Sequence, residues 1–166
     1  MRGFLFAGLV ALGACATVPG NLPMPHYADA ASRGAWGALL AGRPTRAQVD
    51  EATQKWSDAL GDSFACRVPT RQVVDAGLVG ALDVGAMNAA SSGGGASEVR
   101  AGVGRYVVQL ARLAVEDRDR PPPDRCEALA QWAPRTAEAG REAVHRARAN
   151  GLMDNDYGLL MDLLMH

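Results

Sequence analysis

The chain is poor in the residue types on which many binding and catalytic sites depend. Aromatic residues make up only 5% of its 166 residues, which argues against a carbohydrate-binding platform or an aromatic-lined cofactor cleft. It has three histidines and three cysteines, with no Cys-x-x-Cys pair and no two histidines four residues apart. The familiar zinc, haem-attachment and thiol redox motifs are therefore absent.

Motifs of catalysis are missing as well. There is no Gly-x-Ser-x-Gly nucleophile elbow, and the Ser/Gly stretch at 91–95 has no lysine and no strand-to-helix signature of a phosphate loop. Glu142 and His145 have the Glu-x-x-His spacing of metal-binding bundles, but one copy on a charge-rich helix is typical of surface residues. The sequence thus predicts no catalytic, cofactor-binding or metal-ligating residues, and it favours a protein that is not an enzyme.

An excess of charge of one sign is also lacking. Seventeen Lys and Arg residues and 18 Asp and Glu residues are mixed along the chain, for a formal charge of −1. No basic stripe alternates with aromatic residues, so nucleic acid is not predicted as a partner. Hydrophobic residues at 48% and charged residues at 21% are ordinary for a globular protein, and the length predicts one domain.

The N-terminal residues have the organisation of an export signal. Arg2 supplies a positive charge, residues 3–13 are apolar, and small residues follow. The apolar run is too short for a membrane-spanning helix, which needs about 20 residues. A charged start, a short apolar run and small residues together predict a secretory signal peptide.

The apolar run ends in Leu12-Gly13-Ala14-Cys15, which resembles the lipobox of bacterial lipoproteins. The resemblance covers the first 15 residues only. It implies a signal peptide over 1–14, a diacylglycerol on the Cys15 thiol and a further acyl chain, such as palmitate, on the new amino end. Ala16 rather than Asp after the cysteine implies, in Gram-negative members, an anchor on the periplasmic face of the outer membrane.

Two other interpretations of this segment stay open. Ala14-Cys15-Ala16 also fits ordinary signal cleavage after Ala16, which would give a soluble secreted or periplasmic protein. A simple membrane-embedded N-terminus is the third. If Cys15 is lipidated, Cys66 and Cys126 remain as an even pair in an oxidising compartment, and they are predicted to form a structural disulfide.

Residues 15–27 are predicted to be the lipidated cysteine and a Pro-rich tether that lifts the domain off the membrane. Prolines and a glycine between 17 and 25 prevent both a helix and a regular strand ladder there. The domain itself is predicted over 28–166.

Apolar residues recur at helical spacing through most of that domain. We predict an all-α bundle of about five or six helices, at 28–41, at 45–61 (stopped by Gly61), at 70–90, behind a Ser97 cap, and from an Asp124 capping box to 149. Pro134 either kinks the last of these or starts a new helix, and 134–149 reads as a solvated, charge-rich stretch. A short amphipathic helix over 154–166 is either part of the core or an exposed interface.

The helix predicted at 70–90 is unusually apolar and has small residues every fourth position, at Gly77, Ala81, Gly85 and Ala89. We call these four residues the ridge, and we expect another helix to approach it closely. Asp75 and Asp83 lie two turns apart on the same helix. They are expected to pair with arginines such as Arg71 or Arg105, with Asp83 the deeper of the two.

The sequence as a whole favours an envelope lipoprotein that works as a binding or scaffolding module through protein contacts, with the membrane as its anchor and an unidentified envelope protein as its partner. The alternative is an enzyme, or a bundle that binds a small ligand or lipid, with a site near Asp75 and Asp83. The enzyme would need a concave pocket that holds both carboxylates. The ligand-binding bundle would need an apolar cavity beside the ridge.

Overall fold

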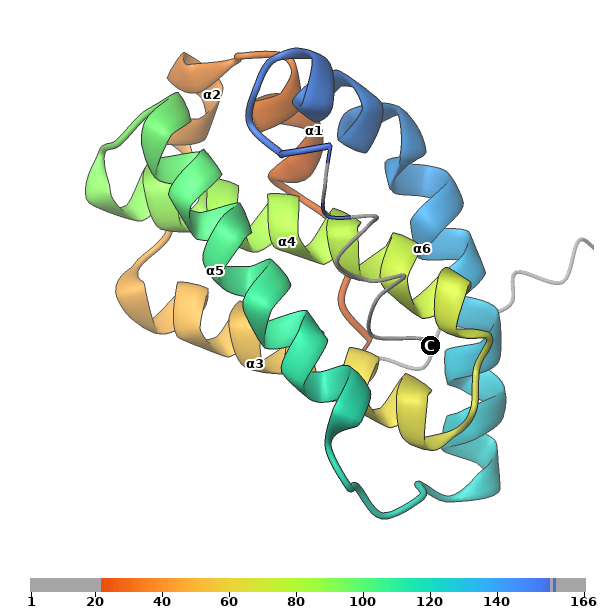
Figure 1. Ribbon diagram of the computed structural model, residues 1–166. Helices are drawn as coiled ribbons and strands as arrows, with labels where there is room; N and C mark the ends of the chain where they lie inside the picture. The colour runs from red at the N-terminus through yellow and green to blue at the C-terminus, as the bar shows by residue number, and fades with distance from the viewer. Residues whose placement is uncertain (1–21, 156, 158–166) are drawn as a thin grey trace, which may run out of the picture.

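The computed structural model describes residues 22–155 and 157. In this part the chain forms six helices and no strand, which confirms the predicted all-α bundle (Figure 1). The helices are α1 (Ala28–Ser32), α2 (Trp36–Ala41), α3 (Arg46–Ala65), α4 (Thr70–Ser92), α5 (Ala96–Val115) and α6 (Pro123–Ala149). The helix predicted over 154–166 lies almost entirely outside the described residues.

Helix α4 is the centre of the bundle and packs against each of the other five helices. Figure 1 shows it running through the middle of the molecule, with α5 crossing in front of it. Within the described residues it is the one helix long and apolar enough to cross a membrane, yet 89% of its apolar window is buried inside the protein. It is therefore the core helix of the domain, as the sequence predicted.

The ridge on α4 brings α5 into backbone contact. A methyl group on Gly85 would lie 2.9 Å from the carbonyl oxygen of Val99, and one on Gly102 would lie 2.8 Å from Gly85 Cα. Further along the ridge, a methyl on Gly77 would lie 2.5 Å from a Leu110 Cδ atom. The ridge is thus close-packed, and it leaves no apolar cavity along these contacts between α4 and α5.

This packing predicts opposite effects for two Gly→Ala substitutions. We expect Gly85→Ala to lower the free energy of unfolding by about 2 kcal/mol, because the added methyl meets backbone atoms that cannot rotate away. In Gly37→Ala, on α2, the methyl meets no atom within 4 Å, so the variant should gain about 0.5–1 kcal/mol from helix propensity. Urea unfolding measures both, and a Gly85→Ala variant as stable as the parent would disprove the close contact.

The prediction of one continuous helix over 28–41 is wrong, because the chain forms two helices there, α1 and α2, with a break at Gly34. Gly34 has φ +67°, a left-handed conformation. The N–H of Gly34 donates to Ala31 O at 3.0 Å and that of Ala35 to Ala30 O at 2.9 Å. These two bonds are the pattern that ends a helix on a left-handed residue.

Helix α3 runs past the predicted stop at Gly61 and ends at Ala65. Its Thr45–Gln48 capping box is confirmed. At the other end Arg67 takes the left-handed conformation, with φ 60°. The N–H of Val68 donates to Ser63 O at 3.0 Å, so this end has the same pattern as the break at Gly34.

Replacing Arg67 by glycine should stabilise the protein. Gly93 and Gly151 hold the equivalent positions after α4 and α6, and Arg67 is the only non-glycine residue with positive φ among those described. Because a side chain strains this conformation, we expect Arg67→Gly to raise the free energy of unfolding by about 0.5–1 kcal/mol. The thermal midpoint would show the gain, and an unchanged or lower midpoint would mean that the Arg67 side chain makes compensating contacts.

The starts of the other three long helices were predicted one or two residues too late. Their N-cap residues are Pro69, Gly95 and Pro122 rather than Thr70, Ser97 and Asp124. In α4 the carbonyl of Pro69 already accepts the N–H of Val73 at 3.2 Å, so the first helical turn closes there. Proline can occupy such positions because its fixed φ is compatible with the backbone conformation at the start of a helix.

Helix α6 is continuous through Pro134, and its second half is less solvated than predicted. Five residues of this half are buried, namely Thr136, Gly140, Ala143, Val144 and Ala147. Gly140 faces the side chain of Val79 on α4. Small residues let α6 approach α4 closely, so this face is buried although it carries few large apolar side chains.

Candidate functional site

Asp83 is the deepest charged residue among those described, with 2% of its surface exposed. Its Oδ1 accepts three backbone N–H groups in a row, from His26 at 2.8 Å, Tyr27 at 2.6 Å and Ala28 at 3.0 Å. Its Oδ2 accepts the indole N–H of Trp56 at 3.4 Å. One carboxylate on α4 thus holds the start of α1, whose first N–H groups have no partner within their own helix.

These contacts correct the prediction that Asp83 pairs with an arginine such as Arg71 or Arg105. Its oxygens are occupied by N–H donors instead. Burial raises the pKa of Asp83 above its usual value, and the hydrogen bonds from Tyr27, Ala28 and His26 oppose that rise without cancelling it. The carboxylate therefore has a structural use that no motif in the sequence signals.

Residues 22–27, which we call the strap, are fixed to the domain at their other end as well. Leu22 belongs to the hydrophobic core and is only 9% exposed. The carbonyl of Pro23 accepts the indole N–H of Trp132 at 2.9 Å. The centroid of the Trp132 ring lies 5.8 Å from the centroid of the Trp56 ring. Within the predicted Pro-rich tether over 15–27, buried apolar and hydrogen-bonded groups therefore hold residues 22–27 on the domain, and residues 15–21 lie outside the described part of the chain.

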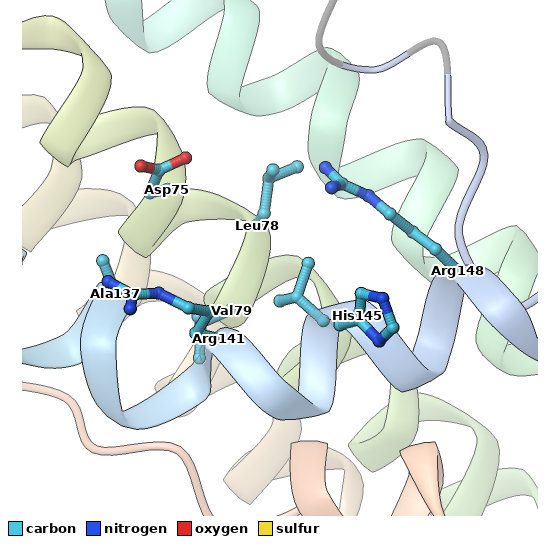
Figure 2. Close-up of a pocket in the computed structure, with 8 residues that line it drawn as sticks. Asp75, Leu78, Val79, Ala137, Arg141, His145 and Arg148 are labelled. Atoms are coloured by element: carbon cyan, nitrogen blue, oxygen red, sulfur yellow. The ribbon is translucent and has the colours of Figure 1, made fainter.

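Asp75 is exposed and lies on a different part of α4 from Asp83. Eight residues of helix separate the two by about 12 Å along the axis. Asp75 borders a hollow of about 230 Å³ between α4 and α6, shown in Figure 2. The hollow is lined by Asp75, Leu78, Val79, Ala137, Arg141, Val144, His145 and Arg148.

Asp83 instead borders a second hollow, of about 290 Å³, between the strap and α3. Its apolar lining includes Met24, Trp56 and Met87, and Lys55 also lines it. The structure does not bring Asp75 and Asp83 together, so the two carboxylates do not form an acid/base pair.

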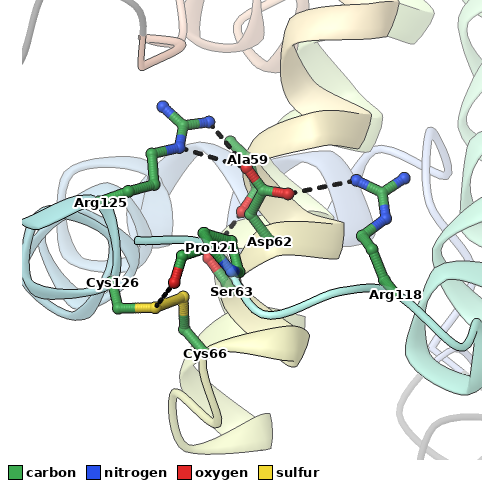
Figure 3. Close-up of a disulfide and its surroundings, with 8 residues drawn as sticks. All are labelled: Ala59, Asp62, Ser63, Cys66, Arg118, Pro121, Arg125 and Cys126. Carbon is green, nitrogen blue, oxygen red and sulfur yellow. Dashed lines mark hydrogen bonds and ion pairs between the residues drawn. A yellow bond between two sulfur atoms is a disulfide. The ribbon is translucent and has the colours of Figure 1, made fainter. Parts of the chain in front are cut away.

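A disulfide joins Cys66 at the end of α3 to Cys126 in the first turn of α6, as the sequence predicted (Figure 3). Beside it, Asp62 accepts two bonds from Arg125, at 3.2 and 3.0 Å, and one from Arg118 at 3.3 Å. We call these five residues the stapled corner. It ties the loop between α5 and α6, and the start of α6, to the last turns of α3.

The stapled corner also explains why Gly61 lies inside α3. A methyl group on Gly61 would lie 2.7 Å from the Cζ of Arg118. The glycine therefore makes room for a guanidinium that reaches Asp62 from another part of the chain. Local sequence shows only a helix breaker at this position, and the arginine that requires it is more than 50 residues away.

Helix α5 carries two stripes with the same four-three spacing. The inner stripe, predicted to be core, is buried throughout and consists of Val99, Val103, Tyr106, Leu110 and Leu113. The outer stripe is exposed throughout, and we call it the α5 outer face; it consists of Ala101, Arg105, Val108, Arg112 and Val115. Val108 and Val115 are 52% and 68% exposed, so two large apolar side chains stand in solvent one heptad apart.

Among the described residues there is no group of three or more His, Cys, Asp or Glu side chains placed to hold a metal ion. Glu142 pairs with Arg146 at 3.0 Å on the surface of α6, and His145 is exposed. Cys15 and its surroundings lie outside the described residues.

The described part of the protein thus belongs to the class of small all-α bundles, here stapled by one disulfide and closed by a strap on a buried carboxylate. Comparison of the chain with the models of known protein families, with curated proteins and with solved structures gives no significant match.

Proposed function

We propose that this protein is a lipid-anchored component of the bacterial cell envelope, on the periplasmic face of the outer membrane, and that it works as a binding or scaffolding module through protein contacts. The lipobox resemblance at Leu12–Cys15 supports the anchor. The fixed strap is the observation that carries the proposal, because it determines how far from the membrane the domain can work.

The strap leaves little chain between the lipid and the domain. Leu22 is buried in the core, and Cys15 stands seven positions before it. A fully extended chain spans at most about 3.3–3.6 Å per residue, so the anchor and the domain lie within about 25 Å of each other. A domain on so short a connection stays close to the membrane, so it contacts its partners at the membrane surface.

The strap also relates the anchor to the α5 outer face. Asp83, which holds the strap, points away from Gly77 and Gly85, which contact α5. The strap therefore lies across α4 from α5, and in Figure 1 it passes behind α4. An anchor attached through the strap leaves the α5 outer face accessible to proteins.

The positions of Asp75 and Asp83 support binding over acid/base catalysis. They border different hollows, and the oxygens of Asp83 are occupied by N–H groups of the protein itself. The close contact between the ridge and α5 argues in the same direction against a lipid-binding cavity at that place.

Fractionation of a Gram-negative host that makes the full chain tests the anchor. We expect the parent protein in the membrane fraction and Cys15→Ser in the soluble or unprocessed fraction. Cys66→Ser/Cys126→Ser is the matched control, because it removes two cysteines without touching the lipobox, and it should stay with the membranes. A soluble parent protein would overturn the proposed anchor.

A further inference from the structure

We infer that the α5 outer face binds an acidic amphipathic helix of a partner protein in the envelope; this inference rests on the proposed role in protein binding and names the surface and the chemistry of the partner. Four large apolar side chains are strongly exposed in the described part of the chain, namely Met24, Leu40, Val108 and Val115. Two of the four, Val108 and Val115, lie on this one stripe.

The charge of the α5 outer face is positive. Arg105 and Arg112 alternate with its valines, and within the described residues neither makes an ion pair. The neighbouring Arg100, by contrast, pairs with Asp154 at 2.7 Å. Glu98 is near Arg105, but its carboxylate accepts the Gly95 N–H at 2.9 Å and the Ser97 hydroxyl. Among the described residues no carboxylate occupies the two guanidinium groups, and carboxylates of a partner can pair with them.

The shape of this face fits a helix. Its five residues follow four-three spacing from Ala101 to Val115, and 14 steps at 1.5 Å make a straight stripe about 21 Å long. A second helix with apolar residues at the same spacing can lie along such a stripe. Carboxylates beside its apolar residues would then meet Arg105 and Arg112.

An anionic lipid surface is a poorer fit. Lipid-binding segments usually gather about four to eight basic residues, whereas this face has two. The apolar residues are two valines, without the Trp or Phe side chains common in interfacial helices. The face also lies across α4 from the strap, through which the proposed anchor is attached.

Photo-cross-linking in the membrane-anchored full chain tests the inference. A benzoylphenylalanine side chain at position 108 should give a protein adduct, and mass spectrometry should place the cross-link in an acidic amphipathic helix. The same probe at position 131, exposed on α6, should not give this adduct. The material is first shown to be in the membrane fraction, so that a failed anchor and a failed interface are told apart.

Charge reversal provides the second arm. Arg105→Glu/Arg112→Glu should reduce the adduct at position 108 by about tenfold or more, because like charges across an interface are strongly unfavourable. Arg135→Glu/Arg141→Glu on α6 is the matched control and should leave it unchanged. The inference is overturned by no protein adduct at position 108, by an adduct on a segment that is not acidic, by a phospholipid adduct, or by an adduct that survives charge reversal.

Discussion

Cys66→Ser/Cys126→Ser is expected to lose about 4 kcal/mol of unfolding free energy, the largest effect of any change considered for this protein. The disulfide closes a loop with a sequence separation of 60. On the chain-entropy model, closing a loop of that length lowers the conformational entropy of the unfolded chain. This raises the free energy of unfolding by about 4 kcal/mol. We expect the folded protein to keep its helices without the bond, so nearly all of this effect should appear as lost stability.

The rest of the stapled corner allows a clean measurement. Asp62, Arg118 and Arg125 still hold the two helix ends near each other when the sulfurs are no longer bonded. The reduced protein should therefore retain its helical circular dichroism and unfold at a much lower urea concentration. A midpoint that does not move on reduction would mean that the unfolded chain is held compact by other contacts.

Asp83→Ala should lower the free energy of unfolding by about 3 kcal/mol. The substitution leaves the N–H groups of His26, Tyr27 and Ala28 without their acceptor, and it frees the indole N–H of Trp56. Each buried donor left without a partner costs about 1–3 kcal/mol, and the groups near the surface cost less because water can reach them. We expect release of the strap before global unfolding, seen as rapid hydrogen exchange at residues 26–28.

Asp83→Asn is the matched control, because it keeps an oxygen for the three N–H groups and loses only the acceptor that faces Trp56. It should cost about 1 kcal/mol, close to the value of a single hydrogen bond. If Asp83→Ala and Asp83→Asn are equally stable, the hydrogen bonds to the strap contribute nothing.

The pH dependence follows from the raised pKa of Asp83, which burial causes. The folded protein keeps a proton that the unfolded chain has released, so the contribution of Asp83 to stability is full below the unfolded pKa of about 3.9. That contribution is lost as the pH rises through the higher folded pKa. The difference in unfolding free energy between the parent and Asp83→Asn should therefore be largest near pH 4 and shrink towards neutral pH, and a growing difference would contradict the assigned direction.

The bundle and its disulfide could be predicted from the sequence because both depend on simple patterns. The inner stripe of α5 recurs at helical spacing, and the apolar run of α4 with a small residue at every fourth position indicates a core helix that another helix approaches closely. Cys66 and Cys126 form an even pair once Cys15 is set aside. Each of these inferences uses only residues close in sequence or a count over the whole chain.

The strap and the stapled corner could not be predicted, because their partners are far apart in the chain. Asp83 meets backbone groups 55 to 57 positions earlier, and backbone N–H groups leave no mark in a sequence. An isolated aspartate in an apolar helix did signal a buried carboxylate, but not its partners. Gly61 was likewise predicted to end the helix. Its actual use, to leave room for the guanidinium of Arg118, could not be predicted because Arg118 lies in a loop far along the chain.

The most direct test of the lipid anchor and the disulfide is the intact mass of the protein purified from the envelope of the host, with and without reduction. We expect a chain that starts at Cys15, carries the mass of added acyl chains, and gains the mass of two hydrogens on reduction. A lipid-free chain that starts at Thr17 would make it a freely diffusing secreted protein and remove the anchor. A chain that still starts at Met1 would contradict export itself.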